Sequence, residues 1–277
     1  SYFSEGQINL TRVKISPKLK ISVAAVDLAF PRAVYGHDIA GTLRGLTVEW
    51  SMKNGFELAG LIGSSKLKWL GDLSPTTFTF KPASVLDWSE VDLRIAFDQI
   101  KAPNFDVLGG ELSGRLSNSF QGLKDAELTL SEIRGNVGKN LVEAEAVKFN
   151  LDNYNVAEQL FQQNSAVTYS LKKVMLPLSD FEGSSIVGDV TLFSGEMIFK
   201  LLMEDAYLMG KQLKAKNVDL TLKRMISDDT FEGNWKFSVS EFELNDPPVK
   251  VQDYSGTLAA TTSGISHIGR AANLSVE

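Results

Sequence analysis

The chain has 277 residues, of which 43% are hydrophobic, and this supplies enough apolar side chain for a folded core. Lys and Arg total 28 against 34 Asp and Glu, so a formal charge of −6 offers no basic surface to a nucleic acid. Cysteine is absent, which excludes disulfides, thiolate nucleophiles and cysteine-based zinc sites. Asp189, Glu196 and Lys200 interrupt the longest apolar stretch, so the sequence predicts no transmembrane helix.

Apolar and polar residues alternate along most of the chain, which predicts half-buried β-strands. The clearest runs, in chain order, are residues 19–23, 91–97, 126–130, 167–171, 218–222 and 235–239. Some runs change phase midway, as between Leu43 and Leu46 across Arg44 and Gly45, and such a change indicates a bulge or bend.

One segment, residues 155–163, predicts a short helix. Asn155 can cap its first turn, and Glu158 stands three residues further on, as in a capping box. A second short turn is expected at residues 83–89. Two such pieces cannot cover a sheet of about a dozen strands, so the apolar faces of the strands must pack on one another or on a ligand.

Four prolines and four glycines recur at similar intervals and indicate an internal repeat. The prolines Pro31, Pro103, Pro177 and Pro247 each end an alternating strand and are 72, 74 and 70 residues apart by subtraction. The glycines that follow, Gly41, Gly110, Gly188 and Gly256, are 69, 78 and 68 residues apart. Residues 1–277 are therefore expected to form a single repeat-built segment of a larger protein. Its approximate units are residues 1–31 (partial), 32–103, 104–177, 178–247 and 248–277 (partial).

These patterns together predict an all-β fold. It is an extended, curved, mainly antiparallel sheet built from repeats of about 70 residues, either a β-groove or a solenoid, with one short helix.

A strand that ends at Pro, followed by a Gly-Thr-Leu or Gly-Glu-Leu strand, resembles the periplasmic region of AsmA-like envelope proteins. Residues 41–43, 110–112 and 256–258 carry these tripeptides. AsmA-like proteins belong to the repeating β-groove, or bridge-like, lipid-transfer group. The resemblance implies a periplasmic location in a Gram-negative bacterium, an inner-membrane anchor upstream of Ser1, and a role in phospholipid transport and outer-membrane biogenesis.

Residues with catalytic or metal-binding chemistry are few, and their spacing favours structural roles. His37 and His267 lie far apart in sequence, and His37 is expected in a loop. The acidic pairs Glu204–Asp205 and Asp228–Asp229 are expected in solvated turns. No nucleophile elbow or phosphate-binding glycine motif occurs, so the sequence predicts neither an enzyme nor a cofactor or metal site.

The sequence predicts instead an apolar groove that binds the acyl chains of phospholipid. Its candidate lining residues are Leu19, Ile21, Val23, Leu93, Ile95, Phe97, Val147, Phe149, Val218, Leu220, Trp235 and Phe237. Two alternatives stay open, because alternation of apolar and polar residues does not separate a groove from a closed core. One is a structural or adhesive β-solenoid without a ligand. The other is a carbohydrate-binding β-sandwich, in which Trp50, Trp69, Trp88 and Trp235 would stack on sugar.

Overall fold

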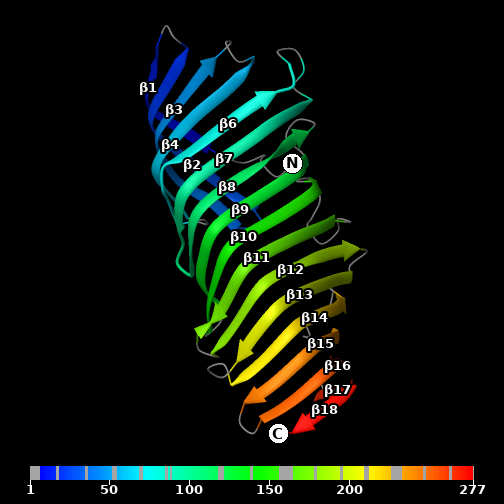
Figure 1. Cartoon of the computed structure of the whole chain (residues 1–277). Helices are drawn as coiled ribbons and strands as arrows, with labels where there is room; N and C mark the ends of the chain where they lie inside the picture. The colour runs from blue at the N-terminus through cyan, green and yellow to red at the C-terminus, as the bar shows by residue number, and fades with distance from the viewer. Residues whose placement is uncertain are drawn as a thin grey trace. The chain divides into compact units, whose positions relative to one another are not determined.

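The computed structural model describes residues 7–16, 19–34, 37–51, 55–68, 71–84, 87, 89–117, 122–137, 140–155, 165–177, 180–193, 196–208, 212–225, 233–245, 248–261 and 264–276. These residues form 18 strands of one antiparallel sheet (Figure 1). The predicted all-β fold is therefore confirmed. The described residues contain no α-helix. The helix expected at 155–163 lies outside them except for Asn155, which is the last residue of a strand.

The strands in chain order are β1 (Gln7–Ile15), β2 (Lys20–Val34), β3 (His37–Ser51), β4 (Glu57–Leu67), β5 (Gly71–Leu73), β6 (Thr76–Pro82), β7 (Glu90–Lys101), β8 (Phe105–Ser117), β9 (Gly122–Val137), β10 (Asn140–Asn155), β11 (Ser165–Leu176), β12 (Phe181–Phe193), β13 (Glu196–Leu208), β14 (Leu213–Met225), β15 (Gly233–Asn245), β16 (Pro248–Thr261), β17 (Gly264–Arg270) and β18 (Asn273–Val276).

The chain divides into two compact units. Unit 1 comprises Ser1–Ser131 and Asn153–Ala157, and unit 2 comprises Glu132–Asp152 and Glu158–Glu277. In unit 1, successive strands pair antiparallel from β1 to β4 and from β6 to β8. In unit 2 the same pattern runs from β10 to β16. Contacts between strands are therefore mostly local in sequence, as expected for a repeat-built sheet.

Two positions in the sheet are filled by interrupted strands. In unit 1, β5 and β6 both pair with β4 on one side and with β7 on the other. In unit 2, β17 and β18 both pair with β16. When β5 and β6 are counted as one position, residues 104–177 and 178–247 each hold four strand positions, and β3 to β7 provide four more. The architecture is repeat-like, and the bounds of the individual repeats stay a prediction.

The proline markers lie at strand ends in two of the three cases that the structure describes. Pro103 follows β7 in a turn closed by the Ala102 N–H donating to the Phe105 carbonyl, and Pro177 directly follows β11. Pro31 is different, because β2 continues past it to Val34. The prediction that a strand ends at Pro31 was therefore wrong. Pro247 lies outside the described residues.

A row of residues with positive φ crosses the strands. In unit 2 it contains Ala146, Ser185, Asn217 and Asp253, on β10, β12, β14 and β16. The register places residues of β11, β13 and β15 between them, so every second strand carries one. In unit 1, Arg12 on β1, Gly45 on β3 and Gly109 on β8 stand at equivalent points. We call these seven residues the positive-φ row.

The alternation of buried and exposed residues changes phase at this row. On β2, Val23 and Val26 are three residues apart, yet they are 5% and 4% exposed. On β13, Met203 and Ala206 repeat this three-residue step. The predicted change of phase at Arg44 and Gly45 is confirmed, since Gly45 has φ 60° and the pairing of β3 with β4 shifts at Arg44. The row therefore keeps the apolar residues of both halves of a strand on one side of the sheet.

Candidate lipid-binding face

Directly opposed residues in antiparallel strands point to the same side of a sheet, so the register identifies the residues that share a face. In unit 2, one line of opposed residues runs through Phe149, Tyr169, Gly188, Leu201, Leu220, Phe237 and Gly256. Every side chain on this line is apolar or aromatic, or is absent because the residue is glycine. This line defines the centre of what we call the apolar face of unit 2.

The remaining members of the face follow from the same register on both sides of the positive-φ row. They are Ala144, Val147, Leu151, Val167, Leu171, Val174, Leu176, Phe181, Gly183, Ile186, Val190, Leu192, Met197, Phe199, Met203, Ala206, Leu208, Leu213, Ala215, Val218, Leu222, Trp235, Val239, Phe242, Leu244, Val249, Val251, Tyr254 and Leu258.

The apolar face of unit 1 is defined in the same way. Its members are Ile8, Leu10, Val13, Ile15, Ile21, Val23, Val26, Leu28, Gly41, Leu43, Leu46, Val48, Trp50, Leu58, Gly60, Ile62, Ser65, Leu67, Gly71, Leu73, Thr76, Phe78, Phe80, Pro82, Val91, Leu93, Ile95, Phe97, Ile100, Val107, Gly110, Leu112, Gly114 and Leu116. The register adds one charged residue to the apolar face of unit 2, Arg224, which is opposite Met197 at the end of β14. The residues named above for the two faces include no Asp, Glu, Lys or Arg.

Three of the polar side chains on the apolar faces are hydrogen-bonded to the backbone. In unit 1, the Ser65 hydroxyl donates to the Gly63 carbonyl at 2.8 Å, and the Thr76 hydroxyl donates to the Ser74 carbonyl at 3.0 Å. In unit 2, the Tyr169 hydroxyl donates to the Lys200 carbonyl at 2.7 Å. Burial, followed by the nearby charge of Asp189, raises the pKa of Tyr169 to about 12, so its hydroxyl stays neutral.

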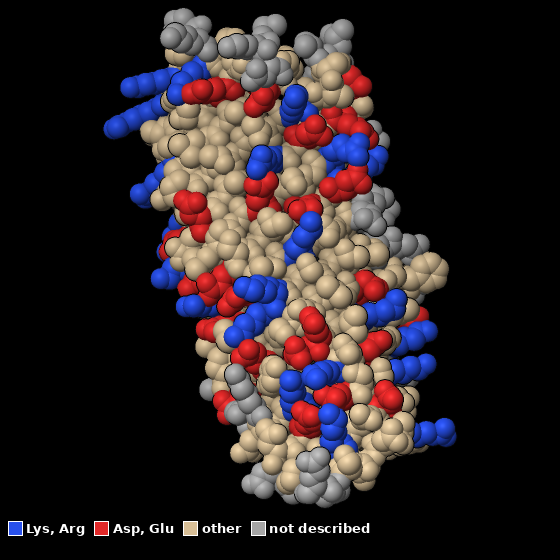
Figure 2. Space-filling model, viewed as in Figure 1, with Lys and Arg blue, Asp and Glu red and all other residues tan. Residues whose placement is uncertain are grey.

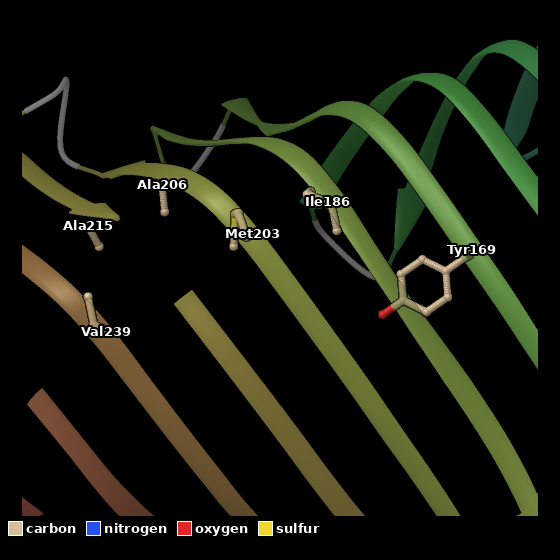
Figure 3. Close-up of a cluster of buried hydrophobic side chains, with 6 residues drawn as sticks. All are labelled: Tyr169, Ile186, Met203, Ala206, Ala215 and Val239. Carbon is tan, nitrogen blue, oxygen red and sulfur yellow. The ribbon is translucent and has the colours of Figure 1, made fainter. Parts of the chain in front are cut away.

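Side chains on the apolar face pack against one another across the strands. Tyr169, Ile186, Met203, Ala206, Ala215 and Val239 form a buried cluster on β11 to β15 (Figure 3). The Tyr169 ring stacks on the Phe199 ring, with their centroids 5.7 Å apart. Around this cluster, Phe149, Leu201 and Phe242 remain only partly buried. A core covered by a second layer buries such large residues more completely. The described part of this face therefore retains apolar surface that a ligand could cover.

Aromatic rings lie over glycines on the neighbouring strand at repeated positions. A Cβ placed on Gly110 would lie 2.0 Å from the Phe97 ring, and one on Gly188 would lie 2.4 Å from the Tyr169 hydroxyl. Phe237 is opposite Gly256 in the same way. Glycine permits this close approach because it lacks a side chain. The three marker glycines thus have a structural role on the apolar face.

The opposite side of the sheet, which we call the charged face, carries the ion pairs. In unit 2, Lys200 lies 3.6 Å from Asp189, and Lys223 lies 2.8 Å from Glu196. In unit 1, Arg94 lies 2.8 Å from Glu111. Cationic and anionic side chains also lie next to one another over the surface that Figure 2 shows. These ion pairs therefore lie on one side of each unit's sheet.

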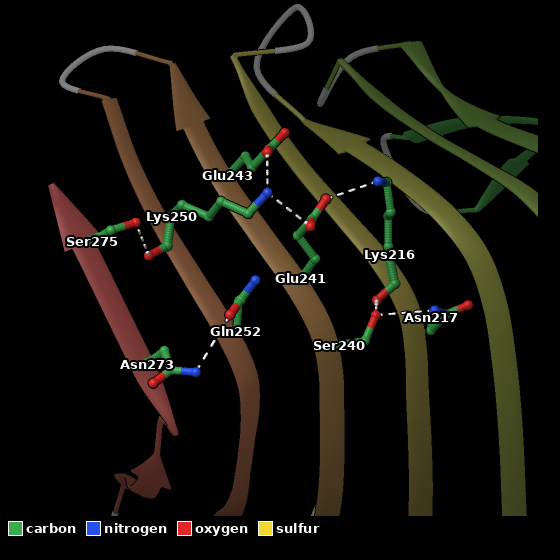
Figure 4. Close-up of polar contacts among 9 residues, drawn as sticks. All are labelled: Lys216, Asn217, Ser240, Glu241, Glu243, Lys250, Gln252, Asn273 and Ser275. Carbon is green, nitrogen blue, oxygen red and sulfur yellow. Dashed lines mark hydrogen bonds and ion pairs between the residues drawn. The ribbon is translucent and has the colours of Figure 1, made fainter. Parts of the chain in front are cut away.

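Glu241 is the centre of a polar network on the charged face of unit 2 (Figure 4). Its carboxylate accepts from Lys216 and Lys250, each at 2.8 Å, and Lys250 also lies 3.0 Å from Glu243. Hydrogen bonds from the two lysines lower the pKa of Glu241 to about 2. Nearby, Ser240 accepts from the Asn217 side-chain amide at 3.0 Å and donates to the Lys216 carbonyl.

Eleven of the twelve predicted groove residues lie on the apolar faces. The structure places Leu220 directly opposite Phe237, and Ile95 directly opposite Phe78. Leu19 is the exception, because it lies in the turn before β2 with φ 55° and is 57% exposed. In unit 1 the face includes Ile21, Val23, Leu93, Ile95 and Phe97, and in unit 2 it includes Val147, Phe149, Val218, Leu220, Trp235 and Phe237.

Several members of the face were missed by sequence reasoning. Ala206 and Ala215 belong to the buried cluster, although they are out of phase with Met203 and Val218 on their strands. Strict alternation assigns such residues to the opposite side. The three-residue step between apolar positions was the signal that could have found them.

The residues considered for other chemistries do not gather at one place in the described structure. His37 is the first residue of β3 and not a loop residue, and His267 on β17 lies 2.7 Å from the Tyr254 hydroxyl. Glu204 and Asp205 lie within β13, so the prediction that they lie in a turn was wrong.

Four of the residues considered for other chemistries lie outside the described residues, namely Asp228, Asp229, Trp69 and Trp88. Trp50 packs edge-on against Phe56, and Trp235 pairs with Leu222 and Leu258.

A polar cleft of about 690 Å³ opens on unit 1 between β3, β4, β5 and β7. Thr42, Lys66, Asp72 and Lys101 line it from directly opposed positions, so their side chains share the charged face. The Lys66 ammonium lies 3.9 Å from Asp72, and both side chains are well exposed. The cleft therefore mixes both signs of charge, and its lining also includes Gly41, Ser65 and Leu73 of the apolar face.

The described residues contain no group of three or more His, Cys, Asp or Glu side chains arranged to hold a metal ion. They also contain no helix that is long and apolar enough to cross a membrane. Comparison with protein-family models, curated proteins and solved structures found no match to the chain.

Proposed function

We propose that this chain binds lipid along its apolar faces and offers the acyl chains of phospholipid a path in a lipid-transfer protein. The observation that carries the proposal is the sorting of charge between the two sides of the sheet. Among the described residues that the register assigns to the apolar faces, Arg224 at the end of β14 is the one charged residue, whereas the charged face holds the ion pairs. An acyl chain has no polar group to satisfy, so such a surface suits it.

The energetic argument depends on apolar area that is still open to solvent. Phe149, Phe199, Leu201 and Leu220 are partly buried, and a chain laid across them would remove further surface from water. Burying a methylene contributes about 0.8 kcal/mol, so about ten buried methylenes would contribute on the order of 8 kcal/mol before the cost of ordering the chain. No single side chain supplies this energy, so no single residue is essential for binding.

Native mass spectrometry of the purified protein, followed by solvent extraction and lipid identification, is the direct test. The expected result is phospholipid that co-purifies at a defined stoichiometry. A folded protein that carries no lipid, and takes up none from vesicles, would refute the proposal and favour the structural or adhesive sheet.

A matched pair of variants tests the assignment of the faces. Leu201 lies on the apolar face, opposite Leu220 and Gly188, whereas its neighbour Leu202 lies on the charged face, opposite Asp219 and Val187. Leu201→Lys should reduce uptake of a fluorescent phospholipid severalfold, because it places an ammonium group in the acyl path. Leu202→Lys should leave uptake unchanged. Thermal unfolding of both variants separates lost binding from lost folding, and equal uptake by two folded variants would contradict the assignment.

The resemblance to AsmA-like envelope proteins leads us to propose the setting as well. We place the protein in the periplasm of a Gram-negative bacterium, held by an inner-membrane anchor, where it supports phospholipid transport to the outer membrane. Cell fractionation tests this placement independently of lipid binding, because a cytosolic protein could still carry lipid.

A further inference from the structure

The polar cleft of unit 1 lies where the sheet is interrupted between β5 and β6. The pairing of β4 with β5 stops at Ser65, and its pairing with β6 begins at Ile62, so residues 63–64 have no partner on this side. Residues 74–75, a serine and a proline, stand across the gap. Proline has no N–H with which to close it. The sequence at this point therefore produces an opening in the sheet.

Side-chain hydroxyl groups fix both sides of this gap. The Ser74 hydroxyl oxygen accepts from the backbone N–H of Asp98 at 3.0 Å and of Gln99 at 2.8 Å, which binds this side to β7. On the other side Ser65, which is 6% exposed, accepts from the Arg44 N–H at 2.9 Å. Bonds to the backbone thus hold the walls of the cleft, so a ligand would meet a preformed space.

Positive charge exceeds negative charge among the residues that line the cleft. Arg44, Lys66 and Lys101 supply three cations, whereas Asp72 supplies one carboxylate. The ammonium group of Lys66 is the one that lies near this carboxylate, at 3.9 Å. The lining therefore has an excess of positive charge, although the whole chain is acidic, with a formal charge of −6.

Two of the three cations have no partner within the part of the chain that the structure describes. Neither Arg44 nor Lys101 forms an ion pair or a side-chain hydrogen bond there. Lys101 is opposite Asp72 and Asp106 in the register, but it forms an ion pair with neither. A cation beside a preformed space is available to an anionic ligand, because a charge-assisted hydrogen bond to an anion is stronger than a neutral one.

We propose that this cleft binds a phosphate group carried by a small hydroxylated molecule, with Arg44 and Lys101 on the phosphate. Both residue types bind phosphate, Arg through its planar fork and Lys as a point charge. Thr42, Ser64 and Gln99, which also line the cleft, offer hydroxyl and amide groups to the rest of the ligand. The volume of about 690 Å³ is in the range of small-molecule sites.

The site does not depend on the proposed binding of lipid, because its cations belong to the charged face. The phosphate can belong to a soluble ester or to the glycerophosphate end of a lipid. These two sources share one chemistry, and the experiment separates them.

Titration calorimetry of the whole protein with glycerol phosphate, in a buffer of low ionic strength, is the test. We expect saturable binding at a single site, and no binding of glycerol, which lacks the charge. The double variant Arg44→Gln with Lys101→Gln should bind about tenfold more weakly or not at all. Lys81→Gln with Lys236→Gln removes the same charge elsewhere on the charged faces and should bind like the natural protein.

Uptake of phosphatidylglycerol from vesicles identifies the source of the phosphate. Reduced uptake by the Arg44→Gln, Lys101→Gln variant supports the site with a lipid headgroup as its ligand. Unchanged uptake, together with weakened binding of glycerol phosphate, supports the site with a soluble ester. A natural protein that takes up no lipid but binds glycerol phosphate refutes the proposed function and leaves this site standing.

Two results would overturn the site. One is the absence of saturable binding of glycerol phosphate to the natural protein. The other is equal binding by the two double variants, which would mean that phosphate follows the net charge of the chain. Thermal unfolding checks that both variants are folded. If the cleft variant is less stable, Lys101→Gln, which changes one exposed side chain, gives the same comparison with Lys81→Gln.

Discussion

The ring of Phe97 lies directly over Gly110 on the neighbouring strand, so close that a Cβ on Gly110 would be 2.0 Å from the ring. Gly110→Ala should therefore destabilise the fold by about 2 kcal/mol, because the ring has to leave its position. Chemical denaturation measures the change. In the background of Phe97→Ala the same substitution should cost much less, and equal costs in the two backgrounds would show that the ring is not the cause.

Ser185 and Ser184 are neighbours that should respond in opposite ways to glycine. Ser185 has φ 51°, a conformation that costs a non-glycine residue about 1 kcal/mol. Ser185→Gly should raise the free energy of unfolding by about 0.5 kcal/mol, since glycine removes that strain. Ser184 does not share the positive φ, so Ser184→Gly should lower the free energy of unfolding by a similar amount. Equal effects at both positions in urea denaturation would contradict a specific role for the row.

The lowered pKa of Glu241 predicts the pH range over which the folded protein loses stability in acid. Its ordinary pKa is 4.5, and hydrogen bonds from Lys216 and Lys250 lower it to about 2 in the folded protein. The unfolded state therefore binds a proton first as the pH falls, so the stability that this network contributes is complete above pH 4.5 and is lost as the pH approaches 2. Glu241→Gln should flatten the decline of unfolding temperature between these values. An unchanged profile would mean that other carboxylates dominate.

Replacing Tyr169 measures how much its buried hydroxyl, on the apolar face of unit 2, contributes to the stability of the fold. Tyr169→Phe keeps the ring over Gly188 and removes the hydrogen bond to the Lys200 carbonyl. Stability should fall by about 1 kcal/mol in chemical denaturation near neutral pH. The natural protein should also lose stability as the pH rises from 10 towards about 12, because the pKa of the folded tyrosine is raised and the unfolded state ionises first. The Phe variant should lack this alkaline component.

The local pattern of the sequence was sufficient to predict the all-β fold and most of the apolar face. Runs such as residues 91–97 and 235–239 lie in β7 and β15, with Leu93 and Phe237 on the expected side. These residues were predictable because alternation with a period of two reports directly which side chains share a face. The recurrence of the marker glycines could also be seen in the sequence. The reason for it is an aromatic ring on the neighbouring strand, and only the register of the strands identifies that ring.

Other features depended on contacts that no local pattern contains. Ala206 belongs with Met203 only because the backbone changes phase between them, and small residues give little hydrophobic signal. Leu19 continues the alternation of Ile21 and Val23, yet it lies in a turn, since β2 begins at Lys20. The adjacent acids Glu204 and Asp205 suggested a turn, but both lie within β13, where Asp205 pairs with Ser184 beside the positive-φ row.

The positive-φ row also changes which residues of a strand, odd-numbered or even-numbered, belong to the apolar face. On β12, Ile186 and Gly183 lie on one side only because Ser185 shifts the alternation between them. Deleting one residue at Ser185 would restore strict alternation along β12. The residues before the deletion would then exchange sides of the sheet, and Phe181 would move to the charged face. Two strands can therefore have apolar residues in matching positions before the positive-φ row and yet, if one of them lacks this shift, have them on opposite sides of the sheet after it.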